Sequence, residues 1–268
     1  MCKCQNEVLQ IFQPLYEKLL QADDRGTPIW KRVAAKELAL TPHFCGEAYE
    51  TSRARLLLVG RAVNGWEYDY SICGSASEMA QTALTQRNPL EDVVKMDGFE
   101  ASGRKRNYLY CRSNFWKLVK LVLAEFGEAD TGITRASWLG ADHPDWNQKI
   151  AWSNLYKLAP FAAGNPDWRL IKPHIEDYVS LIQAELDFYT PRYVLFVTDM
   201  GYFKPWVRKK SFADILDRFD RTENGCIAGS GYYHESKILV CTRPDRWGIT
   251  NEQIGVMAKE IKTAFDVL

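Results

Sequence analysis

The sequence predicts an α/β protein with a mostly parallel sheet, and two observations lead to this class. Four short apolar segments alternate along the chain with segments whose apolar residues have helical spacing. Continuous apolar strands are typical of parallel sheets, because helices cover both faces and neither side of a strand meets water. The alternation of strands and helices indicates the same class.

The four predicted strands are bounded by turn or polar residues, which separate them from the segments between. Gly60 ends the first strand, Asn154 ends the second, and Pro191 precedes the third. The strands span residues 55–59, 150–153, 193–197 and 237–241.

Four helical segments lie between and after these strands, at 114–126, 174–188, 211–219 and 251–265. Pro173 suits an early helical position, and Thr250 suits the N-cap of the last helix. Residues 1–50 are interpreted as an N-terminal helical extension. Because no linker or repeat divides the chain, we expect one α/β domain over residues 1–268.

The composition excludes several classes of protein. The 268 residues include 34 Lys and Arg against 34 Asp and Glu, with 46% hydrophobic residues. Neither a disordered tail nor a strongly basic nucleic-acid coat fits these values. No apolar run approaches the roughly 18 residues of a membrane span, and the amphipathic N-terminus lacks the pattern of a secretory signal. We expect a cytoplasmic protein with no membrane partner.

Cysteine and histidine patterns predict no metal site. The seven cysteines include no C-x-x-C pair, and the four histidines share no catalytic or metal-binding spacing. Phosphate-loop, zinc-protease and dinucleotide-binding motifs are missing as well. We therefore expect free thiols and no cofactor.

Polar residues follow all four predicted strands, and this shared feature predicts a binding site. In open α/β sheets, ligands bind outside the carboxyl ends of the strands. The four exits are 60–70, 154–160, 198–201 and 242–248, and each carries polar groups beside glycine, proline or aromatic residues. We expect these exits to converge on one edge of the sheet.

The order of these segments resembles the uracil-DNA glycosylase superfamily, nearest to its iron–sulfur branch. In that branch the first strand enters a Gly-Glu-Ala-Pro-Gly loop, and here LLLVGRAVNGWEYD occupies this place. The second strand ends in Asn, followed at intervals of three by Lys and Pro, as in Asn154, Lys157 and Pro160. Pro173 and Glu176 match a P-x-x-E helix that precedes the strand in TPRYVLFVTDMG.

Several positions depart from the pattern of that branch. Arg61 stands where the branch has Glu, Val63 where it has Pro, and Arg243 where it has the His of His-Pro-Ser. Leu158 takes the place of a cluster-ligand Cys, and no Cys occurs between residues 112 and 225. The thiolates that would hold an iron–sulfur cluster in the family manner are therefore missing.

The resemblance implies a three-layer α/β/α sandwich around a four-stranded parallel sheet. It also implies an enzyme that hydrolyses the N-glycosidic bond of a damaged or deaminated base in DNA, as in DNA repair. Such enzymes extrude the base into a snug pocket and stack it on an aromatic ring.

Site residues follow from the same resemblance. Asn154 matches the base-reading residue, whose amide offers a donor and an acceptor. Arg243 would stabilise the departing base, worth roughly 3 to 4 kcal/mol per well-placed donor, although it cannot shuttle a proton. No carboxylate aligns with the family's water-positioning residue; Asn64, Glu67 and Asp69 are the nearby substitutes, and the water-holding role is assigned to Asn64 or Glu67. Substrate binding is assigned to Gly60, Arg61, Tyr68, Tyr70, Asn154 and Asp245, with Trp66, Tyr68 or Tyr70 as the stacking ring.

Structural roles remain open for the same residues. Asn64 suits a tight turn, Asn154 suits a strand-end cap, and Arg243 suits a local ion pair with Asp245 worth about 0 to 1 kcal/mol. Two basic-aromatic stretches, 104–108 and 204–210, are either phosphate contacts or solvated loops.

Two other functions remain open as well. The altered motif positions favour a non-catalytic protein that keeps the pocket for a nucleobase, nucleotide or nucleic-acid end. An unrelated small-molecule enzyme that uses the same sheet edge is the third hypothesis.

Overall fold

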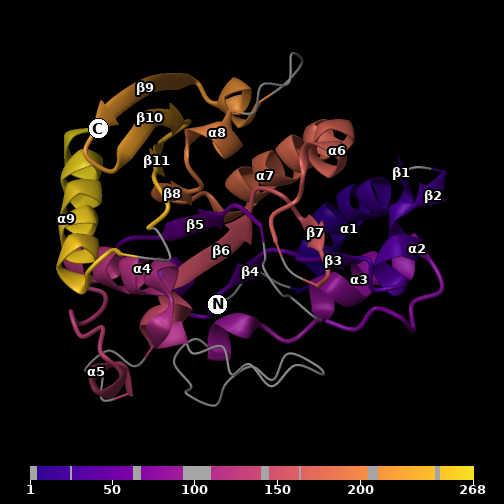
Figure 1. The fold of residues 1–268 in the computed structure, drawn as a ribbon, viewed down its shortest axis with the longest axis horizontal. Helices are drawn as coiled ribbons and strands as arrows, with labels where there is room; N and C mark the ends of the chain where they lie inside the picture. Colours follow the sequence, from indigo (N-terminus) through magenta and orange to yellow (C-terminus); the bar gives the residue numbers. More distant parts are fainter. Residues whose placement is uncertain are drawn as a thin grey trace.

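A computed structural model of the chain describes residues 5–24, 26–62, 68–92, 110–139, 145–162, 164–204, 211–244 and 248–268 (Figure 1). Its helices are α1 (Gln5–Gln21), α2 (Ile29–Ala34), α3 (Ala76–Thr85), α4 (Asn114–Glu125), α5 (Arg135–Leu139), α6 (Trp168–Ile171), α7 (Ile175–Tyr189), α8 (Met200–Phe203) and α9 (Asn251–Val267). Its strands are β1 (Asp23–Asp24), β2 (Thr27–Pro28), β3 (Leu38–Leu40), β4 (Phe44–Cys45), β5 (Leu56–Gly60), β6 (Ile150–Asn154), β7 (Leu158–Pro160), β8 (Tyr193–Val197), β9 (Arg218–Asn224), β10 (Ile227–Tyr233) and β11 (Ser236–Cys241). Over these ranges, no helix is long and apolar enough to cross a membrane.

The main sheet has seven strands in the order β4-β6-β5-β8-β11-β10-β9. The four strands predicted from the sequence are its central members. β5 pairs in parallel with β6 and β8, and β8 pairs in parallel with β11. The expectation of a four-stranded sheet is therefore wrong in strand number, because antiparallel β4 and the β9–β10 hairpin extend the sheet at its two edges.

Helices cover both faces of the central strands, as the continuous apolar runs predict. Leu56 and Leu58 of β5 face a core shared with α4 and α9, whereas Leu57 and Val59 face a second core shared with α1, α3 and α7. In Figure 1, α9 and α4 lie on one side of the sheet and α7 and α1 lie on the other. Each fully buried leucine of this kind contributes roughly 1.5 to 3 kcal/mol.

The segment 211–219 is not the helix expected from the sequence. A single 3₁₀ turn, Phe212–Ile215, is followed by β9, which begins at Arg218. β9 and β10 form a hairpin whose turn consists of Gly225 and Cys226. Glycine suits the first position of a two-residue hairpin turn because it tolerates positive φ, and Gly225 has a φ of 58°.

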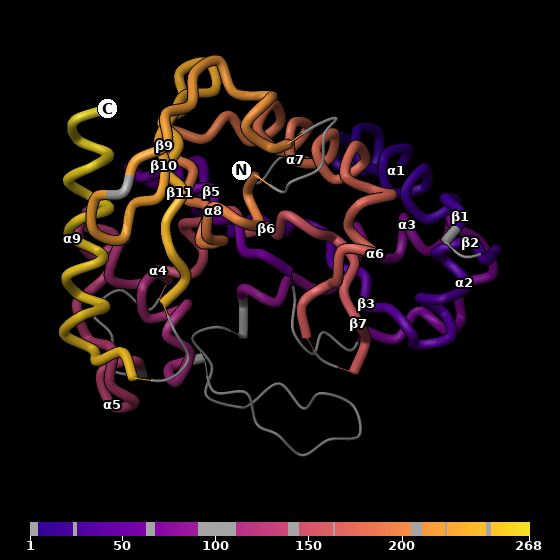
Figure 2. Tube along the Cα trace, turned by 45° about the horizontal axis from the view of Figure 1, so that its top comes forward, coloured from indigo at the N-terminus to yellow at the C-terminus, as the bar shows by residue number. Residues whose placement is uncertain are grey.

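The first fifty residues are more than a helical extension. Helix α1 packs against α3 and α7 (Figure 2), but β3 pairs with β7, and β4 joins the main sheet beside β6. These strands place the N-terminal segment against the exit of β6. The segment is thus part of the same fold as the sheet.

The capping prediction for the last helix is confirmed. The Thr250 hydroxyl accepts a hydrogen bond from the Gln253 backbone N–H (3.2 Å), and the Gln253 side chain accepts one from the Thr250 N–H (2.8 Å). This reciprocal pair satisfies two donors at the start of α9.

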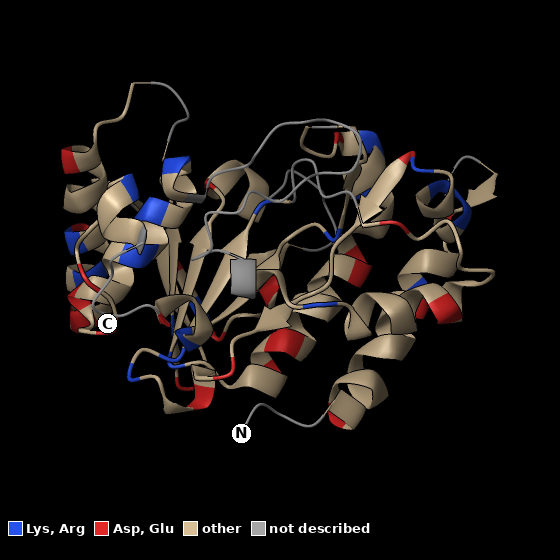
Figure 3. Cartoon of the chain, turned by 90° about the horizontal axis from the view of Figure 1, so that it is seen from below, with Lys and Arg blue, Asp and Glu red and all other residues tan. Residues whose placement is uncertain are grey.

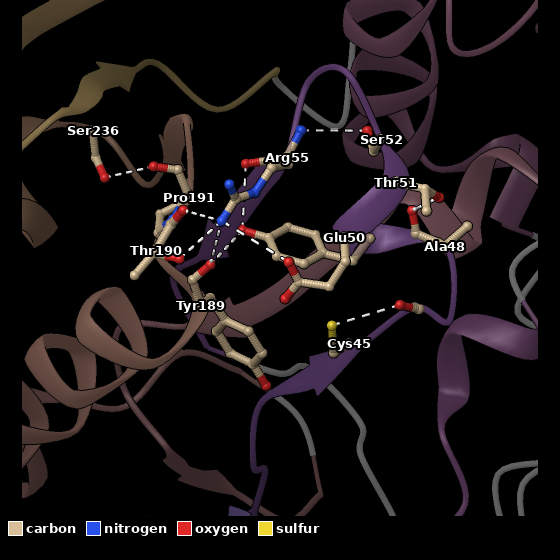
Figure 4. A network of polar contacts seen from close by, with 12 residues as sticks. Cys45, Ala48, Glu50, Thr51, Ser52, Arg55, Tyr189, Thr190, Pro191 and Ser236 are labelled. Atoms are coloured by element: carbon tan, nitrogen blue, oxygen red, sulfur yellow. Dashed lines mark hydrogen bonds and ion pairs between the residues drawn. The ribbon is translucent and has the colours of Figure 1, made fainter. Parts of the chain in front are cut away.

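A polar network fixes the sheet edge at which β5 begins, opposite the strand exits (Figure 4). The Nη2 of Arg55 donates to the carbonyl oxygens of Tyr189 (3.3 Å) and Thr190 (2.6 Å) and to the Thr190 hydroxyl (2.8 Å). These carbonyl groups lie at the C-terminal end of α7, where backbone acceptors lack partners within the helix. The guanidinium therefore ties the end of α7 to the start of β5.

Candidate functional site

Gly60 and Asn154 lie side by side at the ends of β5 and β6, where they are register partners. A Cβ added at Gly60 would lie 2.6 Å from the Oδ1 of Asn154 and 3.8 Å from the ring of Phe115. The amide of Asn154 therefore rests against the Gly60 backbone, with the Phe115 ring of α4 beside both. No larger residue fits at position 60 without moving that amide.

The Asn154 side chain is buried but has an unused donor. Only 3% of the residue is exposed, and its Nδ2 has no hydrogen-bond partner among the residues that the structure describes. Leaving a buried donor unpaired costs about 1 to 3 kcal/mol. An amide held in this state is suited to a ligand that supplies an acceptor.

A buried lysine supports Asn154 from the side of α7. The Nζ of Lys157 donates to the carbonyl oxygen of Asn154 (2.8 Å), to the Ser153 hydroxyl (2.5 Å) and to the Glu185 carboxylate (2.7 Å). Burial lowers the pKa of Lys157, although the charge of Glu185 opposes that shift. For Glu185, burial alone would raise the carboxyl pKa, but Lys157 and His43 together outweigh burial and the pKa is lowered.

His43 extends this buried cluster toward α1. Its Nδ1 lies 3.5 Å from the Oε1 of Glu185, and its ring centroid lies 4.0 Å from that of Phe12. Burial lowers the pKa of His43 despite the nearby carboxylate, so the imidazole is neutral and the Lys157–Glu185 pair carries the charge. Burial raises the pKa of the Tyr16 phenol, and the nearby charge of Glu185 raises it further.

Arg61 is directed across the sheet edge toward the exit of β8. Its Nε donates to the carbonyl oxygen of Thr198 (2.9 Å), and its guanidinium pairs with the carboxylate of Asp199. The guanidinium carbon lies 4.3 Å from the ring centroid of Tyr202, which is a cation–π arrangement. The structure thus joins this predicted substrate-binding residue to a carboxylate from a neighbouring strand.

Asp199 connects three strand exits. Its Oδ1 accepts a hydrogen bond from the Arg243 backbone N–H (2.8 Å), and its own N–H donates to the Cys241 carbonyl oxygen (3.2 Å). Together with the Arg61 pair, these contacts hold the exits of β5, β8 and β11 together. Its backbone has φ 62° and ψ 155°, a region occupied almost only by glycine that costs about 1 to 3 kcal/mol.

The two tyrosines assigned to the site have different surroundings. Tyr70 is 2% exposed, and its hydroxyl donates to the carbonyl oxygen of Leu40 (3.3 Å), so its ring belongs to the core beside β3. Tyr68 is exposed, and its ring centroid lies 4.9 Å from that of Tyr70. Tyr68 is therefore the accessible ring of this pair.

Several predicted site residues lie outside the described residues. They are Asn64, Trp66, Glu67 and Asp245, together with the stretch 104–108 and residues 205–210. The geometry of the candidate site therefore rests on Gly60, Arg61, Asn154 and Arg243. Among the described residues, no group of three or more His, Cys, Asp or Glu side chains is arranged as a metal site.

Two residues of the site were not assigned a role from the sequence. Phe115 falls in a segment with helical spacing, and nothing in that pattern indicates which ring meets a strand end. Asp199 follows the third strand, and this position was the available signal. Its distant partners, Arg61 and Arg243, become neighbours only through the order of the strands.

Comparison of the sequence with protein-family models and with curated proteins finds no match.

Proposed function

We propose that the chain is a divergent uracil-DNA glycosylase-like protein that binds an extruded base beside Gly60 and hydrolyses its N-glycosidic bond. The observation that carries the proposal is the Asn154 amide, which is buried at a strand exit with its Nδ2 unpaired among the described residues. An amide at such a place suits a nucleobase, because the edge of a base presents donors and acceptors side by side.

The arrangement of the strands supports the fold that the family resemblance implies. Strands β6, β5, β8 and β11 are consecutive and parallel, and helices pack on both of their faces. We interpret these layers as a three-layer α/β/α sandwich to which β4 and the β9–β10 hairpin have been added. In this interpretation Asn154 ends β6, and Arg243 follows β11 at the same end of the parallel strands.

Phe115 supplies an aromatic ring for the bound base in this proposal. Its Cε2 lies 3.8 Å from the Cβ position of Gly60, against which the Asn154 amide also rests. Its neighbour Trp116 meets it edge to face, with ring centroids 5.2 Å apart. Base–aromatic stacking contributes about 1 to 3 kcal/mol, so a ring beside the amide would orient the base.

The remaining roles of the proposal are those that the family resemblance implies. Arg243 stabilises negative charge on the departing base, and Asn64 or Glu67 holds water. We place the protein in the cytoplasm with DNA as its partner. Figure 3 shows Lys and Arg interspersed with Asp and Glu on the outer helices, in keeping with a zero net charge. DNA contact would accordingly be local rather than spread over a basic face.

The second candidate function is a non-catalytic nucleobase-binding protein. The Arg61–Asp199 pair favours it, because a cation stands where the family branch has a Glu and is held by a carboxylate. Such a protein would keep base recognition by Asn154 and lack hydrolysis.

The test is incubation with oligonucleotides that carry uracil, hypoxanthine or xanthine, followed by alkaline cleavage of abasic sites. Strand breaks that disappear in Asn154→Ala but persist in Asn6→Ala, an exposed position on α1, would support the glycosylase. Retarded mobility without cleavage would support the binding protein. If the protein neither cleaves nor retards these oligonucleotides, both proposed functions are contradicted and the unrelated enzyme is favoured.

A further inference from the structure

The described part of the first-strand exit offers no carboxylate directed at the Gly60–Asn154 position. Position 61 is Arg, and Asp69 pairs with Lys36 of the turn after α2 (2.9 Å). Hydrogen bonds with Ser71 and Lys36 lower the Asp69 pKa, so this carboxylate is engaged elsewhere. Hydrolysis of a glycosidic bond needs a group that holds the water and takes its proton.

We propose that Asp199 is a catalytic residue that takes the proton of the attacking water, beside the water-holding role given to Asn64 or Glu67; this inference rests on the proposed glycosylase function. Asp199 follows β8, which pairs directly with β5. The exit of β8 is thus two strands from that of β6, a separation of about 10 Å at the usual strand spacing. This distance leaves room for a base held by Asn154, the attached sugar carbon and one water.

The contacts of Asp199 fix its carboxylate without using all its acceptor sites. Oδ2 pairs with Arg61, and Oδ1 accepts the N–H of Arg243 at 2.8 Å. A carboxylate has about four lone-pair sites, so each oxygen retains one for water. The side chain is 32% exposed, which allows water to reach it from the sheet edge.

The backbone of Asp199 is a second argument for a role beyond stability. A residue with a Cβ is strained at its φ of 62° and ψ of 155°, and glycine would relieve that strain. Strained residues of this kind cluster at functional sites, where surrounding contacts hold them in place. Here the contacts with Arg61, Arg243 and Cys241 keep Asp199 in this conformation.

The proposed step balances in atoms and charge. The water oxygen forms a bond to C1′ of the sugar while the bond from C1′ to the base nitrogen breaks. The electron pair of that bond stays on the departing base. The water proton passes to the Asp199 carboxylate and then, through solvent, to the released base.

Asp199→Asn is the direct test, because it keeps the shape of the side chain and removes its charge. We expect its kcat for base excision to fall about 10²- to 10⁴-fold, while base-containing DNA is still retarded in a mobility shift. Asp220→Asn on β9, where the side chain is 59% exposed, is the matched control and should retain wild-type kcat. Thermal melting of both variants verifies that they fold.

The variant Arg61→Gln distinguishes a catalytic role of Asp199 from a purely structural role of its ion pair with Arg61. If the pair served only to hold the strand exits together, Arg61→Gln would reduce kcat as much as Asp199→Asn, and the inference would be overturned. An Asp199→Asn variant with wild-type kcat overturns the inference alone and leaves the glycosylase in place. A wild-type protein that excises none of the three bases overturns the proposed function and this inference together.

Discussion

The ammonium of Lys157 lies 2.8 Å from the carbonyl oxygen of Asn154, so a buried cation holds the backbone of the residue proposed to read the base. Lys157 is in turn bound to Glu185, which lies 3.5 Å from His43. The candidate site at the sheet edge is thereby joined to a charged cluster in the core. Changes in that cluster should alter both stability and base recognition.

Replacing Lys157 by Met should destabilise the fold. Removing one partner of a buried ion pair leaves the other charge uncompensated, at a cost of about 3 to 5 kcal/mol. Urea unfolding measures this loss. The double variant Lys157→Met/Glu185→Leu should recover most of it, because no charge is then left buried. Lys259→Met, at an exposed position of α9, should change the free energy of unfolding by less than about 0.5 kcal/mol.

Acid should destabilise the protein in two stages. The pKa of His43 is lowered by burial from 6.5, so the unfolded chain binds a proton that the folded chain refuses. Stability therefore falls as pH drops below 6.5, by up to about 1.4 kcal/mol per pH unit. The lowered pKa of Glu185, ordinarily 4.5, adds a second loss as the carboxylate becomes protonated.

The variant His43→Phe isolates the first stage. Urea unfolding at several pH values should give it a flatter profile than wild type between about pH 7.5 and about pH 5, on either side of the ordinary imidazole pKa. Equal slopes for the two proteins would mean that His43 is protonated in the folded state as readily as in the unfolded state.

Gly60→Ala should damage the site more than the fold. Its Cβ would lie 2.6 Å from the Asn154 Oδ1, so the amide must move away from its position. We expect lost base binding and excision. The control is Gly255→Ala in α9, where a Cβ meets nothing within 4 Å; it should retain binding and gain about 0.5 to 1 kcal/mol of stability. Normal base binding by Gly60→Ala would show that the amide position is unimportant.

The thiols of Cys226 and Cys241 should be inert in the folded protein. Burial raises the pKa of Cys226 to about 12 and also raises that of Cys241. Because the thiolate is the reactive form, alkylation at neutral pH followed by peptide mass spectrometry should leave both unmodified until urea unfolds the chain. Among the cysteines that the structure describes, Cys45, which is only half-buried, should react first. Rapid labelling of Cys241 would indicate that the end of β11 opens.

The central strands were predictable because their burial on both faces produces continuous apolar runs. β9 was missed because it is an edge strand whose sequence, RFDRTEN, is mostly polar; edge strands commonly carry charge, which discourages pairing with other chains. Gly225, which begins the turn to β10, was the overlooked signal. Residue spacing alone cannot reveal pairing between distant side chains, so the association of His43 with Glu185 required the fold.

The candidate site was predictable to the extent that strand order determines it. Gly60 and Asn154 end neighbouring parallel strands and are register partners, as the rule for ligand sites in α/β sheets suggests. Phe115 and Asp199 could not be assigned from spacing, because helix rotation and the path of the Arg61 side chain decide which groups meet. The roles given to Asn64, Glu67 and Asp245 stay predictions.

The most direct test of base recognition is the NMR signal of the Asn154 side-chain amide, identified by its loss in Asn154→Ala. Uracil, hypoxanthine and xanthine are each titrated into the ¹⁵N-labelled protein. We predict a saturable shift of the Nδ2–H signals with at least one base, because the buried donor gains an acceptor. An Asn154 signal that does not move with any of the three bases, while the protein remains folded, would contradict the account.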